Sequence, residues 1–190
     1  MDMGTSEEPR VRRFTADEAM RMVELGIVGE DEHEELLDGA LVEMTPKGPE
    51  HADTTTMVAE RLRAAYVGAG RVREEKPLAI DAYNLPEPDI AVVRGGPGTS
   101  AHHHPTGPEA VLVVELSRSS QRRDRRRTSV YAAGGVDVYW ILDLEARRLE
   151  VRTAPVDGAY QVTRVLDEDD VVELPETQPA VRWTVRDLLS

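Results

Sequence analysis

One stretch limits the fold more than any other: residues 110–116 read AVLVVEL, the most apolar run in the chain. A continuous run of valine and leucine of this length is typical of a strand buried on both faces of a sheet. The run contains one charged residue, Glu115. Because an unpaired buried carboxylate is costly, Glu115 needs a compensating partner, which a divalent cation or an arginine could supply.

The segments that follow this strand predict a parallel pairing. Residues 122–133 form an arginine-rich helical pattern that Gly134 and Gly135 end, and residues 138–142, VYWIL, are a second buried strand. A helix between two buried strands is a crossover connection, which joins parallel neighbours. Residues 90–93 add a short apolar strand. We therefore expect an α/β fold in which these three strands are neighbours in a mixed sheet.

Turn signals predict further elements around this centre. Asp38-Gly39 and Asp157-Gly158 each lie between apolar segments, which favours two hairpins that add antiparallel edges to the sheet. Thr15 and Glu18 have the spacing of a capping box, which starts a first helix. The other expected elements are helices at 15–24, 51–67 and 183–189, the last started by Thr184, a strand at 72–80 and an exposed loop at 95–108.

The 190 residues are enough for one domain with a buried core. We expect residues 1–11 to be a disordered tail and residues 12–190 to form a single domain. The absence of cysteine excludes disulfides and thiolate metal sites, and it fits a reducing cytoplasm. No apolar run approaches the ~18 residues that a membrane span requires, so a cytoplasmic protein is expected.

Asp89 and Glu115 each lie at one end of an apolar strand. Two carboxylates at adjacent strand ends could share one Mg²⁺, a hard ion that prefers oxygen ligands. The structural alternative is that Asp89 caps a turn and Glu115 pairs with an arginine of the next helix. On spacing alone this alternative is favoured, because structural ion pairs are commoner than catalytic sites.

An ordered set of short motifs favours the metal site over the structural ion pair. The set contains ELLDG at 35–39, His51 at a helix start, PEPD at 86–89, VVE at 113–115 with Ser117, YAAGGV at 131–136 and YWILD at 139–143. Together these motifs resemble the Uma-type family of restriction endonucleases, within the PD-(D/E)xK nuclease superfamily, and the resemblance covers roughly residues 12–190. The resemblance implies the restriction-endonuclease-like fold, a mixed central sheet flanked by helices, and a metal-dependent endonuclease that hydrolyses DNA phosphodiester bonds.

The resemblance also implies roles for five residues. Asp89 and Glu115 would bind Mg²⁺, with Mn²⁺ as a substitute. Arg127, four positions before Tyr131, would take the place of the family's lysine and steady the attacking water or the charge of the transition state. Glu35 and His51 would line the same cleft.

The sequence departs from the family pattern on either side of the site. Only Leu116 separates Glu115 from Ser117 where the family has two residues, and Asp124 precedes Tyr131 by seven positions instead of eight. If the strand register follows Ser117, Glu115 points away from Asp89. If a bulge or the following loop absorbs the difference, Glu115 stays in place. Arginine also exchanges a proton less readily than lysine does.

The charge distribution does not decide whether the protein binds nucleic acid. The formal net charge of −13 should repel nucleic acid at long range, yet six arginines are concentrated in one stretch. They are Arg118, Arg122, Arg123, Arg125, Arg126 and Arg127, and they form either a phosphate-contact surface or a solvated helix face. The tract His102–His104 is expected to be an exposed surface segment. A homodimer is one alternative for the oligomeric state, and no membrane partner is expected.

Two functions follow. The first is a Mg²⁺-dependent endonuclease acting on DNA, which Asp89, Glu115 and the arginine cluster favour. The second is a catalytically weakened or inactive nuclease-fold protein that binds nucleic acid or protein, which the net charge, the missing lysine and the shortened spacings favour.

Overall fold

The computed structural model describes residues 11–29, 34–44, 46–96, 98–117 and 121–189, with the backbone alone at 121–125. The tail expected at residues 1–11 lies outside this range except for Val11. Among the described residues, no helix is long and apolar enough to cross a membrane.

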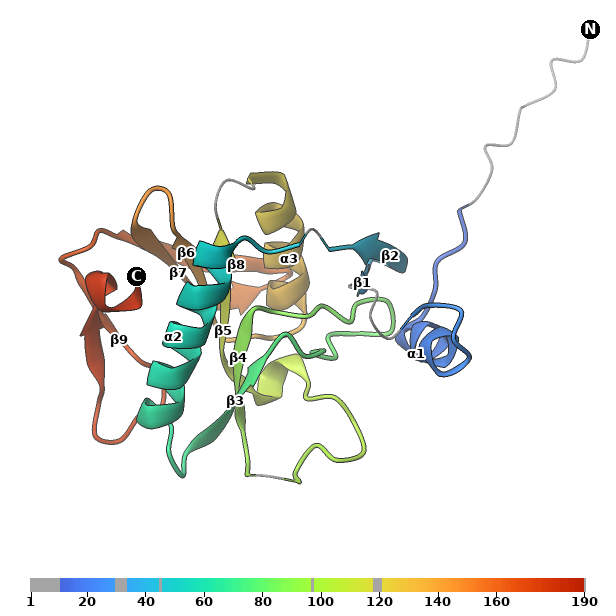
Figure 1. The fold of residues 1–190 in the computed structure, drawn as a ribbon, viewed down its shortest axis with the longest axis horizontal. Coiled ribbons are helices and arrows are strands. Elements are labelled where there is room, and N and C mark those ends of the chain that lie inside the picture. Colours follow the sequence, from blue (N-terminus) through green and yellow to red (C-terminus); the bar gives the residue numbers. More distant parts are fainter. Residues whose placement is uncertain (1–10, 30–33, 45, 97, 118–120, 190) are drawn as a thin grey trace, which may run out of the picture.

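A six-stranded sheet forms the centre of the molecule, in the order β3-β4-β5-β6-β7-β8 (Figure 1). Strands β5 and β6 are parallel, and the other neighbouring pairs are antiparallel. The predicted α/β fold with a mixed sheet and three neighbouring central strands is therefore confirmed. The strands are β3 Gly70–Glu74, β4 Ile90–Arg94, β5 Ala110–Ser117, β6 Val138–Asp143, β7 Arg148–Val156 and β8 Ala159–Leu166.

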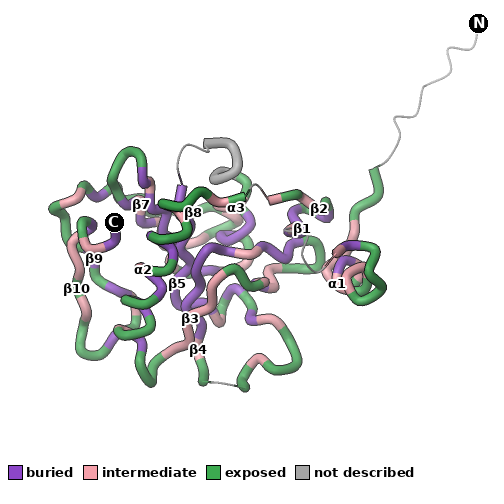
Figure 2. The backbone as a smooth tube through the Cα atoms, in the orientation of Figure 1, coloured by how far each residue is buried: buried purple, intermediate pink, exposed green. Residues whose placement is uncertain are grey.

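Helices cover both faces of this sheet, as a strand buried on two sides requires. On one face Leu112 and Val114 of β5 belong to the same core cluster as Leu62 of α2 (Pro49–Ala65). On the other face Val113 packs in a second cluster with Tyr131 of α3 (Gln121–Ala133). Every residue of β5 is buried, and this strand lies in the interior of the molecule (Figure 2). The alternating side chains of β5 thus join the two halves of the core.

The predicted hairpin at Asp38-Gly39 forms, but the expectation that it extends the central sheet is wrong. Strands β1 (Glu34–Leu37) and β2 (Ala40–Glu43) make a separate two-stranded sheet, with Asp38 and Gly39 both at positive φ in the turn. The hairpin packs beside α1 (Ala16–Glu24), away from the sheet edges (Figure 1). The reason is that Leu36 packs with Ala19 and Leu85 in a small core of its own.

Other boundaries differ from the expectation for local reasons. Strand β3 ends at Glu74 because Glu75 adopts a left-handed conformation, with φ of 48°, so the predicted strand at 72–80 is too long. The closing helix is the short 3-10 helix η2 (Val185–Leu188), begun by the predicted cap Thr184. Trp183 instead belongs to β10 (Arg182–Thr184), which pairs with β9 (Val171–Glu173). The predicted capping box of α1, formed by Thr15 and Glu18, is present.

Candidate active site

Asp89 and Glu115 meet at one end of the sheet. Ile90 of β4 pairs with Val114 of β5, so Asp89 and Glu115 occupy the next position along each of these antiparallel strands. The backbone N–H of Leu116 donates a hydrogen bond of 2.7 Å to Asp89 Oδ2. Both side chains are buried, with 2% of Asp89 and 5% of Glu115 exposed. The chain therefore brings together the two carboxylates that the sequence singled out.

Glu115 faces α3, so the shortened spacing to Ser117 does not turn it away from the site. The Tyr131 hydroxyl donates to Glu115 Oε1 at 2.7 Å, and Arg127 Nη1 donates to Glu115 Oε2 at 2.6 Å. Strand β5 pairs with β6 in regular register from Val113 to Ser117. Burial raises the pKa of the Glu115 carboxyl above its usual range, although the Arg127 guanidinium acts against this.

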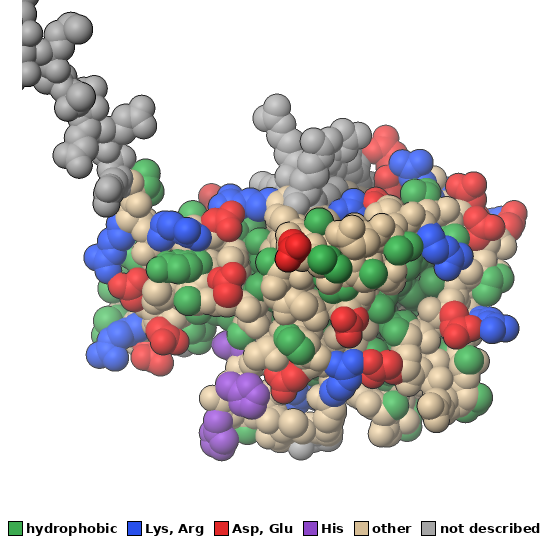
Figure 3. Space-filling view, turned by 180° about the vertical axis from the view of Figure 1, so that it is seen from behind, with side chains coloured by type: hydrophobic (Ala, Val, Ile, Leu, Met, Phe, Trp, Pro, Cys, Tyr) green, Lys and Arg blue, Asp and Glu red, His purple; other side chains and the backbone are tan. Residues whose placement is uncertain are grey.

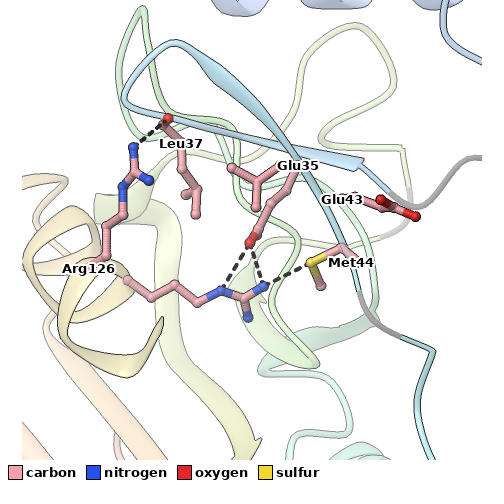
Figure 4. Close-up of a pocket in the computed structure, with 7 residues that line it drawn as sticks. Glu35, Leu37, Glu43, Met44 and Arg126 are labelled. Carbon is pink, nitrogen blue, oxygen red and sulfur yellow. Dashed lines mark hydrogen bonds and ion pairs between the residues drawn. The ribbon is translucent and has the colours of Figure 1, made fainter. Parts of the chain in front are cut away.

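Arg127 connects this strand to the hairpin. Its Nη2 and Nε donate to Glu35 Oε1 at 2.7 and 3.2 Å, and Nη2 also lies 3.2 Å from Met44 Sδ (Figure 4). With Nη1 on Glu115, all three guanidinium nitrogens are engaged, and only 11% of the side chain is exposed. Arg127 is therefore held as an internal link between two carboxylates from distant parts of the chain.

Asp89 has a different set of partners, which come from the start of α2 and the loop before it. Lys47 Nζ contacts Asp89 Oδ1, and His51 Nε2 lies 3.3 Å from the same oxygen. Although burial acts to raise it, the nearby His51 imidazole and the charge of Lys47 lower the pKa of Asp89 to about 2. His51, proposed from the family resemblance, thus lies beside Asp89.

Lys47 is a site residue that sequence reasoning missed. The ammonium group also contacts Glu75 Oε1 at 2.8 Å, and 23% of the side chain is exposed. Although burial disfavours its charge, Asp89 and Glu75 raise the pKa of Lys47. The signal available in the sequence was its rarity, because Lys47 and Lys76 are the only lysines in the chain.

A cavity of about 190 Å³ opens beside Arg127. The hairpin and α3 line it together, and Figure 4 shows the labelled Glu35, Leu37, Glu43, Met44 and Arg126 that contribute to its wall. The remaining lining residues are Val42 and Arg127. Glu35 Oε2 is buried and accepts no hydrogen bond within the described part of the chain.

Asp89 and Glu115 have the chemistry of a hard-cation site. They supply carboxylate oxygens, and the Asp89 charge adds to the effect of burial that raises the pKa of Glu115. Mg²⁺ would bind such oxygens and take its remaining ligands from water. Across the ranges that the structure describes, no three His, Asp or Glu side chains form a ready-made metal site. The residues therefore fit a weakly held ion with two protein carboxylates.

The arginine cluster divides into residues with different surroundings. Arg127 is turned inward, which corrects its expected place on a phosphate-contact surface. Arg126 Nε pairs with Asp38 Oδ2 at 2.7 Å and its Nη2 donates to the Leu37 carbonyl, so it also holds the hairpin. Arg118 lies outside the described residues, as do the side chains of Arg122, Arg123 and Arg125.

The histidine tract lies in the loop between β4 and β5. His102 and His103 are exposed, and His104 is half-buried in the same loop. Figure 3 shows the histidine side chains gathered at one edge of the molecule. His103 Nε2 lies 3.9 Å from Glu109 Oε1. The expected exposed segment is thus present.

The chain matches one family model and is similar to a solved structure. The profile of the Uma2 family, described as "Putative restriction endonuclease", matches residues 17–186. Among solved structures, the chain is similar to the crystal structure of a putative nuclease belonging to DUF820 from Anabaena variabilis ATCC 29413. The TM-score is 0.75 at 18% identity, and the match covers 92% of this chain and 97% of the other. A search of curated proteins found no match.

Proposed function

Because this chain belongs to the Uma2 family of putative restriction endonucleases, we propose that it hydrolyses DNA phosphodiester bonds at Asp89 and Glu115 with a divalent cation. The observation that carries the proposal is the buried pair of carboxylates at the adjoining ends of β4 and β5. Buried ionisable groups whose pKa values are shifted in opposite directions are concentrated at functional sites, and Asp89 and Glu115 are such a pair.

In this proposal Asp89 and Glu115 hold Mg²⁺, or Mn²⁺ in its place. When bound, the ion would stabilise negative charge on a phosphate and activate a water molecule. Arg127 and Tyr131 orient Glu115 from α3, and Glu35 fixes Arg127 in turn. His51 contacts Asp89 from the start of α2 and orients that carboxylate.

A nicking assay on plasmid DNA with Mg²⁺ tests the proposal. Asp89→Asn keeps the shape of the side chain and an acceptor for the Leu116 N–H, but removes the charge. We expect it to slow nicking by roughly 100-fold or more. Asp53→Asn is the matched control because Asp53 is exposed on α2, and it should nick as wild type does. Equal nicking by wild type and Asp89→Asn would refute the site.

Calorimetry with Mn²⁺ tests the metal directly. Two carboxylates leave much of the coordination to water, so we expect modest affinity for the wild type. Asp89→Asn should bind at least about 10-fold more weakly, because half of the charged ligand set is lost. If both proteins bind Mn²⁺ equally, Asp89 is not a ligand.

One observation favours a second function, that of a nuclease-fold protein that binds nucleic acid without cutting it. Both carboxylate oxygens of Glu115 already accept hydrogen bonds, one from Tyr131 and one from Arg127. A cation could displace Arg127 only if Glu35 and the guanidinium group rearranged. Retained DNA binding in a gel-shift assay, with no nicking in Mg²⁺ or Mn²⁺, would establish this second function over the first.

A further inference from the structure

We propose that Lys47, and not Arg127, is the cation that contacts the reacting phosphate, so that the loop between β2 and α2 supplies the lysine that α3 lacks. The inference rests on the proposed function. It concerns which residue of this chain supplies positive charge to the substrate, a role that the family resemblance gave to Arg127.

Arg127 is unsuited to the role because its guanidinium group is held between two buried carboxylates. Its three nitrogens are occupied by Glu35, Glu115 and Met44. Only 11% of the side chain is exposed, and both of its carboxylate partners are buried. Moving this guanidinium onto a phosphate would leave two buried carboxylates without their cation, which is strongly unfavourable.

Lys47 meets the requirements that Arg127 does not. Its ammonium group contacts Asp89, the proposed metal ligand, and 23% of the side chain is exposed. Lysine carries a compact charge on a flexible stem, so it can move from Asp89 to a nearby phosphate oxygen when a cation takes over that carboxylate. Its position in a loop, and not within α2, leaves room for that movement.

The backbone around Glu75 supports the same assignment. Glu75 is a non-glycine residue at φ of 48°, a conformation that costs energy and is concentrated at functional sites. Its N–H donates to the carbonyls of Pro88 and Asp89, both at 3.2 Å, and its carboxylate accepts from Lys47. The strained residue thus joins the backbone of Asp89 to the side chain of Lys47, and holds the lysine at the site.

In the proposed reaction, Lys47 would supply a positive charge in addition to the metal. A water oxygen bonds to phosphorus, the bond from phosphorus to the leaving deoxyribose oxygen breaks, the water loses a proton to solvent and the leaving oxygen gains one. Negative charge builds on the non-bridging phosphate oxygens. The Lys47 ammonium donates a hydrogen bond to one of them, and a donor placed where charge develops accelerates a reaction by about 100- to 1000-fold.

The experiment compares Lys47→Met, Lys47→Arg and Asp89→Asn in plasmid nicking and in Mn²⁺ calorimetry. Lys76→Met is the matched control, because Lys76 is the only other lysine and is exposed. We expect Lys47→Met to nick about 100-fold more slowly and Lys47→Arg to recover part of the rate. Mn²⁺ should bind Lys47→Met at least as tightly as wild type, because the ammonium no longer competes for Asp89. Lys76→Met should match wild type in both assays.

Three results would overturn the inference, and each is distinct. Nicking by Lys47→Met at the wild-type rate would remove Lys47 from the reaction. Parallel losses of nicking and Mn²⁺ binding in Lys47→Met would reduce Lys47 to a residue that positions Asp89. Wild-type nicking that is absent, or unchanged in Asp89→Asn, would refute the proposed function and the role of Lys47 with it.

Discussion

Arg127 is the described side chain that links the two buried carboxylates Glu35 and Glu115. It neutralises two carboxylates, Glu35 and Glu115, that are 3% and 5% exposed. Removing one partner of a buried ion pair leaves an uncompensated charge, which costs far more than the net contribution of the intact pair. The neighbouring Arg126 offers a contrast, because its pair with Asp38 is largely exposed.

We therefore expect Arg127→Met to lower the free energy of unfolding by about 3–5 kcal/mol. Arg126→Met should lower it by about 0–1 kcal/mol, the range of an exposed pair. Urea titrations followed by tryptophan fluorescence measure both, since Trp140 is buried in the core. Similar losses for the two variants would mean that Arg127 is not the neutralising partner of Glu35 and Glu115.

At the level of elements, the β1–β2 hairpin is fixed by polar contacts more than by a shared sheet. Arg126 and Arg127 of α3 hold it on one side, and the Asp38 N–H donates to Asn84 Oδ1 at 2.8 Å on another. Leu36 and Leu85 also pair through their backbones in an isolated antiparallel β-bridge. The ionic links to α3 thus act together with the apolar contacts of Leu36 to place Glu35 in the site.

Glu35→Gln should loosen this hairpin. Replacing the charged acceptor weakens the link to Arg127 by about 1.5–3 kcal/mol, so amide hydrogen exchange in β1 and β2 should be at least about 10-fold faster. Glu43→Gln is the control within the same hairpin, because Glu43 is exposed. Exchange that is unchanged in Glu35→Gln would show that the apolar contacts of Leu36 fix the hairpin by themselves.

The elements also show how far the sequence could predict this structure. The central strands and α3 follow from local patterns: the apolar run ending at Glu115, the arginine-rich helix and the glycines after it. Turn chemistry identified both hairpins, but not where the first one packs, because that depends on Leu36 meeting Ala19 and Leu85 across the fold. Lys47 could not be placed at Asp89 for the same reason, since no local pattern links a loop lysine to a strand 42 residues away.

For the whole molecule, the net charge of −13 repels DNA. Binding of DNA therefore depends on where the positive side chains lie. Arg126 and Arg127 are committed to contacts within the protein. The sequence offers four more arginines in the same stretch for phosphate contacts, and we propose these as the DNA-binding residues: Arg118, Arg122, Arg123 and Arg125.

If all four contact phosphates, the DNA affinity should fall with salt at a log–log slope of roughly −3.6, about −0.9 for each contact. Changing any one of them to alanine should make the slope less steep by about 0.9 and weaken binding to all sequences alike. Fluorescence anisotropy on Asp89→Asn, which should not cut, measures this between 50 and 200 mM salt. A slope that the alanine variants leave unchanged would place the DNA elsewhere.

The ion pair between Arg127 and Glu35 joins residues 92 positions apart, and this has a consequence for how the protein is made. A ribosome releases Glu35 long before Arg127, and closing so long a loop is slow compared with forming local structure. Until the hairpin reaches α3, Glu35 does not hold the Arg127 guanidinium that orients Glu115. The cavity beside Arg127 also lacks the wall that the hairpin supplies. Under the proposed function, we therefore expect hydrolysis only from the finished fold and not from a partly synthesised chain.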